Sequence, residues 1–254
     1  MLKLAEEHDV DSLVGFLENR GAIGARIGAY LRCYRTGMND IYFWYQKSDG
    51  IIATVVSKVD GNMTVCSTAD SDFDEIKEFI RIIGFSSLFM HFGDFRRIGI
   101  EPDNKGAILE YCGNTEVSDT VEISSETDMK DSYELLKRCQ SESISVPDYL
   151  PWLSDFTYKR NRNSARARSI THNSLQVCFA MTSAETEKSA LISGVVTDSN
   201  YRKQGLASRL VTALSDELRN ENKAVYIMTA NENNRKFYEK NGFVPIGKWG
   251  SVIG

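Results

Sequence analysis

The stretch Tyr201-Arg202-Lys203-Gln204-Gly205-Leu206-Ala207 joins an apolar run to an amphipathic helix, and it decides how the second half of the chain folds. The run before it, residues 190–197, is typical of a mostly buried strand, and residues 198–200 favour a turn. After it, apolar residues recur at helical spacing as far as Leu218. In such a unit the first N–H groups of the helix point beyond the strand end, where the helix dipole favours an anion. The stretch therefore predicts a phosphate-binding loop, in which Gly205 lets the backbone approach its ligand closely.

A second motif follows further along the chain. Residues 224–229 show another short buried-strand pattern, and the residues after Asn231 indicate a short helix that Gly242 ends. The chain thus carries R-x-x-G-x-A at 202–207 and N-x-x-N-x-x-F-Y-x-x-x-G-F at 231–243. Together, in this order and at this spacing, the two motifs resemble the acetyl-CoA-binding core of the GCN5-related N-acetyltransferase (GNAT) superfamily.

The resemblance covers roughly residues 118–254, and the strand end at 195–197 with Tyr201 resembles the FR47-like branch of the superfamily. It implies that residues 202–207 hold the pyrophosphate and that residues 195–197 pair with the pantetheine arm. It also implies that an amide contact to the cofactor arm comes from Asn231. The implied cofactor-binding residues are Val195, Val196, Thr197, Arg202, Lys203, Gln204, Gly205, Leu206, Ala207, Asn231 and Asn234, and the implied general acid is Tyr238. The family often has glycine at the position of Ala207, which is a small-for-small difference.

The chemistry of acetyl transfer to a primary amine requires a base, an oxyanion donor and an acid. Backbone N–H groups near residues 195–197, at a strand end splayed from its neighbour, are suited to polarise the carbonyl, and Tyr238 is suited to protonate the leaving thiolate. The alternative for Tyr238 is a packed aromatic ring beside Phe237. Residues 188–197 contain no Asp or Glu, so the base is water or a carboxylate from elsewhere, with Glu142 and Asp155 as candidates.

With 42% hydrophobic and 26% charged residues, the chain has the composition of an ordinary globular protein. Its length of 254 residues suits two domains. The net charge of −5 disfavours nucleic acid or an anionic membrane as main partner. The sequence has no apolar run of membrane-spanning length and no basic-then-apolar leader at Met1. Five cysteines without a C-x-x-C pair favour reduced thiols and a cytoplasmic location. The three histidines lie apart from cysteine or carboxylate pairs, so we expect no metal.

In the C-terminal half the sequence predicts two helices, three strands, a helix, a strand, a helix and a last strand, with the first strand expected at about residues 164–171. The N-terminal half begins with the same order of elements. Apolar periodicity predicts two helices, around residues 10–17 and 23–31, and then a meander of three strands within residues 41–67. A helix from Phe73 that ends at Gly84 and a strand around 88–90 follow. We therefore expect a divergent repeat with domains 1–115 and 116–254 and a linker near Gly113-Asn114-Thr115. An unrelated α+β domain is the alternative for the first half.

The two halves differ at the junction that would hold phosphate. The N-terminal junction has no glycine and carries four carboxylates, Asp70, Asp72, Asp74 and Glu75, where the C-terminal junction has Arg202 and Lys203. Because like charges repel at close range, an anion is disfavoured there. The first half is thus interpreted as a GNAT-like domain that has lost its cofactor site.

A basic cluster follows the second predicted helix of the C-terminal half. Its members are Lys159, Arg160, Arg162, Arg166 and Arg168. Such a cluster is compatible with nucleic-acid binding or a localisation signal, but its alternation in Ala165-Arg166-Ala167-Arg168 suits a half-exposed strand, and we favour a structural and site-lining role.

The sequence therefore predicts a mixed α/β (α+β) tandem GNAT-like fold, with a mixed central sheet flanked by helices and an acetyl-CoA site in the C-terminal half. The predicted activity is acetyl-CoA-dependent N-acetylation, by direct attack, of a primary amine on a small molecule or peptide that the sequence does not identify. The alternative is a CoA-binding sensor or pseudoenzyme that mediates protein interaction. We expect neither a nucleic-acid nor a membrane partner, and the sequence indicates no oligomeric state.

Overall fold

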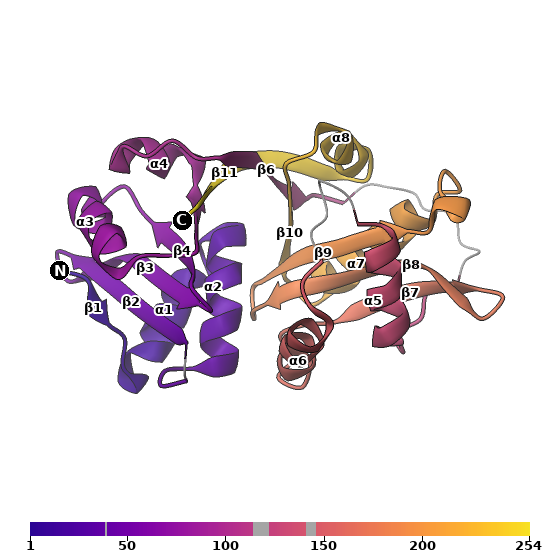
Figure 1. The fold of residues 1–254 in the computed structure, drawn as a ribbon, viewed down its shortest axis with the longest axis horizontal. Helices are drawn as coiled ribbons and strands as arrows, with labels where there is room; N and C mark the ends of the chain where they lie inside the picture. Colours follow the sequence, from indigo (N-terminus) through magenta and orange to yellow (C-terminus); the bar gives the residue numbers. More distant parts are fainter. Residues whose placement is uncertain (39, 114–121, 141–145) are drawn as a thin grey trace. The chain divides into compact units, whose positions relative to one another are not determined.

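The computed structural model describes residues 1–38, 40–113, 122–140 and 146–254 (Figure 1). The chain forms two compact units. The first contains Met1–Ile108 and Ile246–Gly254, and the second contains Leu109–Pro245. The predicted domain boundary at 115/116, and most of the predicted linker, lie outside the described residues.

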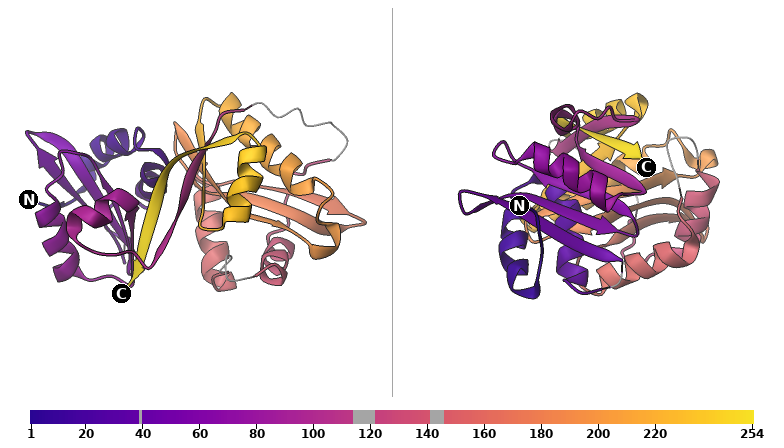
Figure 2. Two further views of the ribbon diagram at one scale, coloured as in Figure 1. Left: turned by 90° about the horizontal axis from the view of Figure 1, so that it is seen from above. Right: turned by 60° about the vertical axis from the view of Figure 1, so that its left-hand side comes forward.

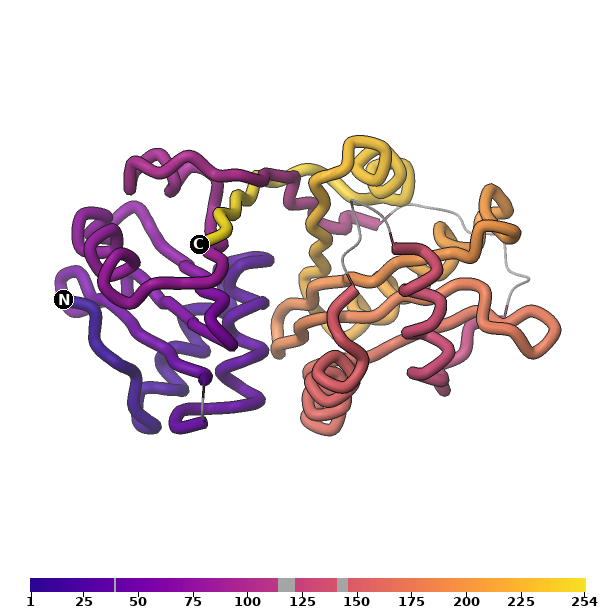
Figure 3. Tube along the Cα trace, viewed as in Figure 1, coloured from indigo at the N-terminus to yellow at the C-terminus, as the bar shows by residue number. Residues whose placement is uncertain are grey.

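The first unit begins with two neighbouring helices, α1 and α2, and the chain trace in Figure 3 shows them side by side. Its elements are β1 (Lys3–Leu4), η1 (Glu7–Asp9), α1 (Val10–Leu17), α2 (Gly21–Tyr34), β2 (Ile41–Ser48), β3 (Ile51–Val59), β4 (Asn62–Ser67), α3 (Phe73–Ile83), β5 (Ser87–His91), α4 (Phe92–Ile98) and β6 (Asn104–Tyr111), whose last residues belong to the second unit. The helices, the meander and the strand expected from the sequence are confirmed. The sequence did not predict α4 and β6.

The sheet of the first unit has the order β1-β2-β3-β4-β5-β11. The strands β2, β3 and β4 are antiparallel neighbours, whereas β4 and β5 are parallel. Ile76 and Ile80 of α3 pack with Met63 of β4 and Leu88 of β5 in one buried cluster. The helix α3 ends where the sequence predicts, because Gly84 takes a φ of 66° that favours glycine.

The second unit follows the predicted order of two helices, three strands, helix, strand, helix and strand. Its elements are α5 (Met129–Arg138), α6 (Tyr149–Arg160), β7 (Ala167–His172), β8 (Leu175–Glu185), β9 (Ser189–Thr197), η2 (Ser199–Tyr201), α7 (Leu206–Asn220), β10 (Ala224–Thr229), α8 (Glu232–Lys240) and β11 (Phe243–Ile253). Its strands have the order β10-β9-β8-β7, with β9 and β10 parallel. The strand β7 begins at Ala167 rather than at the expected 164, because the N–H of Ser164 donates to the carbonyl of Lys159 at the end of α6.

The last strand, β11, is divided between the two units. It begins in the second unit and continues from Ile246 in the first. Figure 2 draws it as the yellow strand that leads to the C-terminus. There, the residues from Trp249 to Ile253 pair antiparallel with β5, and Trp249 lies opposite His91. The ring of Trp249 stacks on Phe89 with the ring centroids 5.3 Å apart. The first unit therefore needs the end of the sequence to complete its sheet.

Candidate active site

The strands β9 and β10 are neighbours only over the first part of their length. Their registered pairs end at Ile192 and Ile227, whereas β9 continues to Thr197 and β10 to Thr229. The two parallel strands therefore part beyond Ile192 and Ile227. Ligands of open α/β sheets bind where neighbouring strands part at their carboxyl ends. Residues 195–197, which the sequence assigns to the cofactor, lie on the parted segment.

A β-bulge coincides with this divergence. Phe179 of β8 pairs with Val196 and Met181 pairs with Ser193, so that residues 194–195 together oppose a single residue. Gly194 has a φ of 61°, a conformation that glycine adopts at little cost. The side-chain oxygen of Ser193 is buried at this point, and it has no hydrogen-bond partner within the described parts of the chain. The sequence analysis did not single out Ser193, because a lone serine in a strand carries no spacing signal.

The predicted phosphate loop lies just beyond β9 and leads into α7. Lys203 and Gly205 have φ values of 62° and 78°, in the left-handed region. A Cβ atom on Gly205 would meet no atom within 4 Å, so glycine is required by the backbone conformation rather than by crowding. The Nε of Arg202 donates to the carbonyl oxygen of Thr197 at 3.0 Å, which ties the loop to the strand end.

The N-terminus of α7 carries no cap. Gly205 occupies the N-cap position, and no side chain accepts from the first turn. The first bond of the helix runs from the N–H of Arg209 to the carbonyl of Gly205. The N–H groups of Leu206, Ala207 and Ser208 precede it, and these residues are only half-buried. With the helix dipole, they form an anion-binding end next to the strand divergence.

The corresponding junction of the first unit is filled by its own side chains. The carboxylate of Asp72 caps α3 by accepting from the N–H of Glu75 at 3.0 Å. Gln46 of β2 donates to the carboxylate of Glu75 at 2.6 Å and accepts from the N–H of Asp72 at 2.8 Å. The carboxylate of Asp72 thus takes up an N–H of the first turn of α3, whereas no side chain does so in α7. The repulsion of an anion at this junction stays a prediction.

Asn231 occupies the N-cap position of α8. Its Oδ1 accepts from the N–H groups of Asn233 and Asn234, at 2.9 and 3.0 Å. This bonding gives the first asparagine of the motif a structural role that the sequence analysis missed. Asn234 is exposed in the first turn of α8. The contacts of Asn231 and Asn234 to a cofactor remain predictions.

Tyr238 lies on α8 with only 8% of its surface exposed. Its ring meets Phe237 edge-on at 5.1 Å and Phe243 edge-on at 5.7 Å between centroids. Burial raises the pKa of its phenol to about 12. The hydroxyl is therefore protonated throughout the physiological range and is suited to donate a hydrogen bond rather than to act as a base.

Of the two candidate bases, Asp155 lies within the described residues and Glu142 does not. Asp155 lies on α6, where its carboxylate accepts from Lys159 at 2.8 Å. Since Lys159 is buried, this bond neutralises a charge inside the unit. Glu142 lies outside the described residues. The strand β9 itself contributes no carboxylate.

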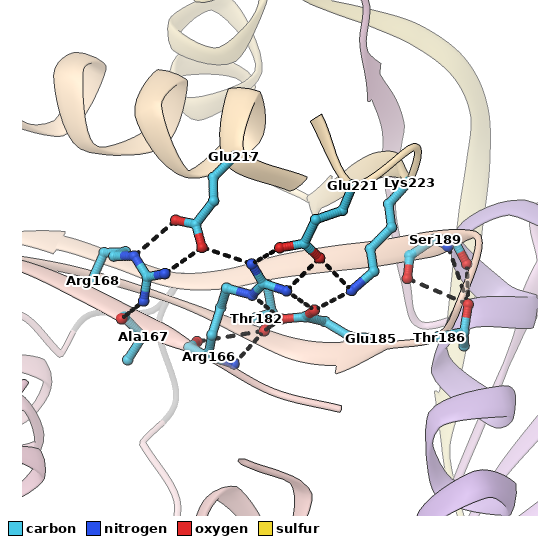
Figure 4. Close-up of polar contacts among 10 residues, drawn as sticks. All are labelled: Arg166, Ala167, Arg168, Thr182, Glu185, Thr186, Ser189, Glu217, Glu221 and Lys223. Atoms are coloured by element: carbon cyan, nitrogen blue, oxygen red, sulfur yellow. Dashed lines mark hydrogen bonds and ion pairs between the residues drawn. The ribbon is translucent and has the colours of Figure 1, made fainter. Parts of the chain in front are cut away.

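Two members of the basic cluster, Arg166 and Arg168, belong to an ion-pair network, shown in Figure 4. The guanidinium of Arg166 binds Glu185 and Glu217 at 2.7 Å each, and Glu221 at 2.5 Å. Burial lowers the pKa of Arg166, but the hydrogen bonds that Arg166 donates to Glu221 and Glu185 outweigh this effect and raise the pKa overall. Arg168 binds Glu217 as well. The carboxylates lie far away in sequence, so the pattern of basic residues did not reveal them.

Glu185 is the buried centre of this network, with a side chain 1% exposed. Its Oε1 accepts from the Nε of Arg166 at 2.8 Å and from the hydroxyl of Thr182 at 2.7 Å. Its Oε2 accepts from Arg166 and from Lys223, at 2.7 Å each. The network therefore joins the start of β7, the end of β8 and the end of α7, as Figure 4 shows.

Comparison with known proteins defines the class of the fold. The chain is similar over 99% of its length to 97% of a tandem GNAT protein from the clavulanic acid biosynthesis pathway, with a TM-score of 0.63 and 14% identity. It is similar over 99% of its length to 98% of a Drosophila protein, with a TM-score of 0.66 and 12% identity. A GNAT-family acetyltransferase from Colwellia psychrerythraea matches over all of both chains, with a TM-score of 0.61 and 10% identity. The fold is that of tandem GNAT proteins.

The family itself follows from the sequence of the second unit. Residues 130–243 match the family described as Acetyltransferase (GNAT) family, so this part of the chain is a GNAT acetyltransferase domain, the domain of a family of acyltransferases. No curated protein matches the chain. The prediction of the superfamily from two short motifs is confirmed.

Two further properties concern the described residues alone. They contain no group of three His, Cys, Asp or Glu side chains arranged to hold a metal ion. None of the helices among them is both long and apolar enough to cross a bilayer.

Proposed function

We propose that the second unit transfers an acetyl group from acetyl-CoA to a primary amine of a small molecule or peptide. The observation that carries the proposal is the uncapped N-terminus of α7, which lies beside the divergence of β9 and β10. Uncapped N–H groups and a glycine with open space above it fit a pyrophosphate. The thioester of acetyl-CoA supplies the activated acyl group.

Three parts of the unit would divide the work of binding. The loop residues Arg202, Lys203, Gln204, Gly205, Leu206 and Ala207 hold the pyrophosphate. The backbone of Val195, Val196 and Thr197, which has no registered partner on β10, is available to pair with the pantetheine arm. Asn231 and Asn234 at the start of α8 contact the same arm from the other strand end.

Tyr238 would supply the proton that the departing thiolate requires. Its pKa of about 12 keeps the hydroxyl neutral, and burial also strengthens any hydrogen bond it donates. The hydroxyl stabilises negative charge that develops on sulfur, which is how a positioned acid contributes to catalysis. Since β9 carries no carboxylate, we assign removal of the amine proton to water or to a carboxylate outside the strand.

The test of the loop compares two substitutions at one position, Gly205→Asp and Gly205→Asn. Both place a short polar side chain at a φ of 78°, which Asp and Asn tolerate best among non-glycine residues. They differ by one negative charge at the helix N-terminus. We expect calorimetry to show acetyl-CoA affinity at least about tenfold weaker for Gly205→Asp than for Gly205→Asn. Equal affinities in two folded variants would remove the loop from the binding site.

A CoA-binding sensor is the second candidate, and the absence of a carboxylate from β9 favours it. A sensor would bind acetyl-CoA without releasing CoA. An acceptor screen that detects the free thiol separates the two functions, because an acetyltransferase releases one thiol for each acetyl group transferred. Turnover with any amine rules out the sensor.

The same proposal includes one cofactor site in each chain, with the first unit as a degenerate GNAT-like domain. Its support is the self-filled junction of Asp72, Gln46 and Glu75. An FR47-like classification, supported by the motif at residues 195–201, and a cytoplasmic location, supported by five free cysteines, also stand as proposals.

A further inference from the structure

The first unit contains an open cavity of about 250 Å³ whose lining is chemically mixed. The start of α2 contributes Arg20 and Ile23, the end of β4 contributes Cys66 and Ser67, and His91 and Asp94 complete the wall. Ile23 and Cys66 are buried, so the cavity has an apolar floor. Arg20 and His91 are exposed, so it is reached from solvent.

The cavity lies where two parallel strands part. The registered pairs of β4 and β5 end at Thr64 and Phe89, whereas β4 continues to Ser67 and β5 to His91. This is the same divergence that β9 and β10 show in the second unit. The first unit thus keeps the cleft between its strands, although its phosphate junction is closed by Asp72 and Glu75.

Two opposite charges face this cavity without neutralising each other. The guanidinium of Arg20 lies 4.6 Å from the ring centroid of Phe16, and it has no carboxylate partner within the described parts of the chain. The carboxylate of Asp94 accepts one hydrogen bond, from the hydroxyl of Ser67 at 2.6 Å, and has no cationic partner in those parts either. Both side chains line the cavity together with Cys66.

The floor of the cavity is neutral, and the start of α2 favours an anion near Arg20. Burial raises the pKa of the Cys66 thiol to about 12, so the floor carries no charge. Arg20 is also the N-cap residue of α2, where no side chain caps the helix. The first bond of that helix runs from the N–H of Gly24 to the carbonyl of Arg20, so the N–H groups between them have no helical partner. These groups add to the attraction for an anion.

We propose that this cavity binds a small zwitterion, with its carboxylate on Arg20 and the start of α2 and its ammonium group on Asp94. A ligand with both charges supplies each side chain with the oppositely charged partner that it lacks among the described residues, whereas a simple anion is repelled by Asp94 and a simple cation by Arg20. The volume lies below the roughly 300–1,000 Å³ of sites for drug-sized ligands, which restricts the ligand to the size of an amino acid. This site is separate from acetyl transfer, which the second unit carries.

The experiment uses the full chain labelled with ¹⁵N and follows its amide resonances as probes are added. L-Alanine is compared with propionate and with ethylammonium, which keep its size but carry one charge each. We expect L-alanine at about 10 mM to shift the amides of residues 19–24 and 91–94, and each single-charge probe to bind at least about tenfold more weakly.

Two substitutions locate the binding, and two others control for charge alone. Arg20→Gln and Asp94→Asn each weaken L-alanine binding at least about tenfold. Arg81→Gln removes an exposed arginine whose one ion pair among the described residues is with Glu78 of α3, and Asp11→Asn removes an exposed carboxylate of α1, so both leave binding unchanged. Absence of shifts at these amides, equal binding of propionate, or binding unaffected by Arg20→Gln and Asp94→Asn would each overturn the proposal.

Discussion

Replacement of Arg166 by methionine tests whether the network around Glu185 stabilises the second unit. The substitution keeps an unbranched apolar side chain but removes two of the four hydrogen bonds to a carboxylate that is 1% exposed. Loss of one partner from a buried ion pair costs about 3–5 kcal/mol, because the other charge stays buried. Lys223 remains on Glu185 at 2.7 Å, so we expect the lower end, about 3 kcal/mol. Urea unfolding measures this loss of stability, and amide hydrogen exchange of β8 and β9 tests whether the loss lies in the second unit.

The control for this prediction is Arg162→Met. Arg162 is exposed, and its guanidinium stacks 3.6 Å from the ring centroid of Tyr158 without an acidic partner among the described residues, so its loss should cost under about 1 kcal/mol. Glu185→Leu added to Arg166→Met removes the buried charge and should recover part of the loss. A cost for Arg166→Met no larger than that of Arg162→Met would show that the network does not stabilise the unit.

Three other outcomes are expected. Tyr238→Phe should lower kcat roughly a hundredfold with little change in acetyl-CoA affinity, and a kcat within about twofold of the original in steady-state assays limited by chemistry would leave Tyr238 as a packing residue. The Arg166 hydrogen bond lowers the pKa of Glu221 from 4.5 to about 2, so its stabilisation is present above pH 4.5 and lost as the pH falls towards 2. Because Glu221 is 40% exposed, Glu221→Gln should reduce the acid-induced loss of unfolding free energy by only about 1 kcal/mol, measured by urea unfolding at falling pH. An unchanged dependence of the unfolding free energy on pH would contradict the assignment. Calorimetric titration of the full chain with CoA should give one site, and two equivalent sites would contradict the self-filled junction at Asp72.

Most of the features that could be predicted from the sequence are encoded by adjacent residues. The helix α3 and its end at Gly84 follow from apolar spacing and a glycine at the C-cap, which are written in adjacent residues. The loop at residues 202–207 and the uncapped start of α7 could be predicted in the same way, because glycine and the strand–helix order are local too.

Features that depend on distant residues could not be predicted. The partners of Arg166 lie 19 to 55 residues away, and no spacing rule links an arginine just before a strand to the end of a helix. The resemblance assigns Asn231 to the cofactor, and in the structure its Oδ1 caps its own helix. One motif residue can serve both purposes, so the motif did not reveal the cap. The sequence indicated a final strand after Gly242, but periodicity does not say which sheet a strand joins.

The position of β11 has a consequence for biosynthesis. Domains generally fold as units, with N-terminal domains first, while the chain is being made. The first unit cannot follow that order to completion, because β5 waits for residues 249–253 as its antiparallel neighbour. Until they arrive, one side of β5 presents unpaired backbone groups, which attract other strands. The unit that is synthesised first is thus the last to be finished, and the second unit must be made before the first is closed.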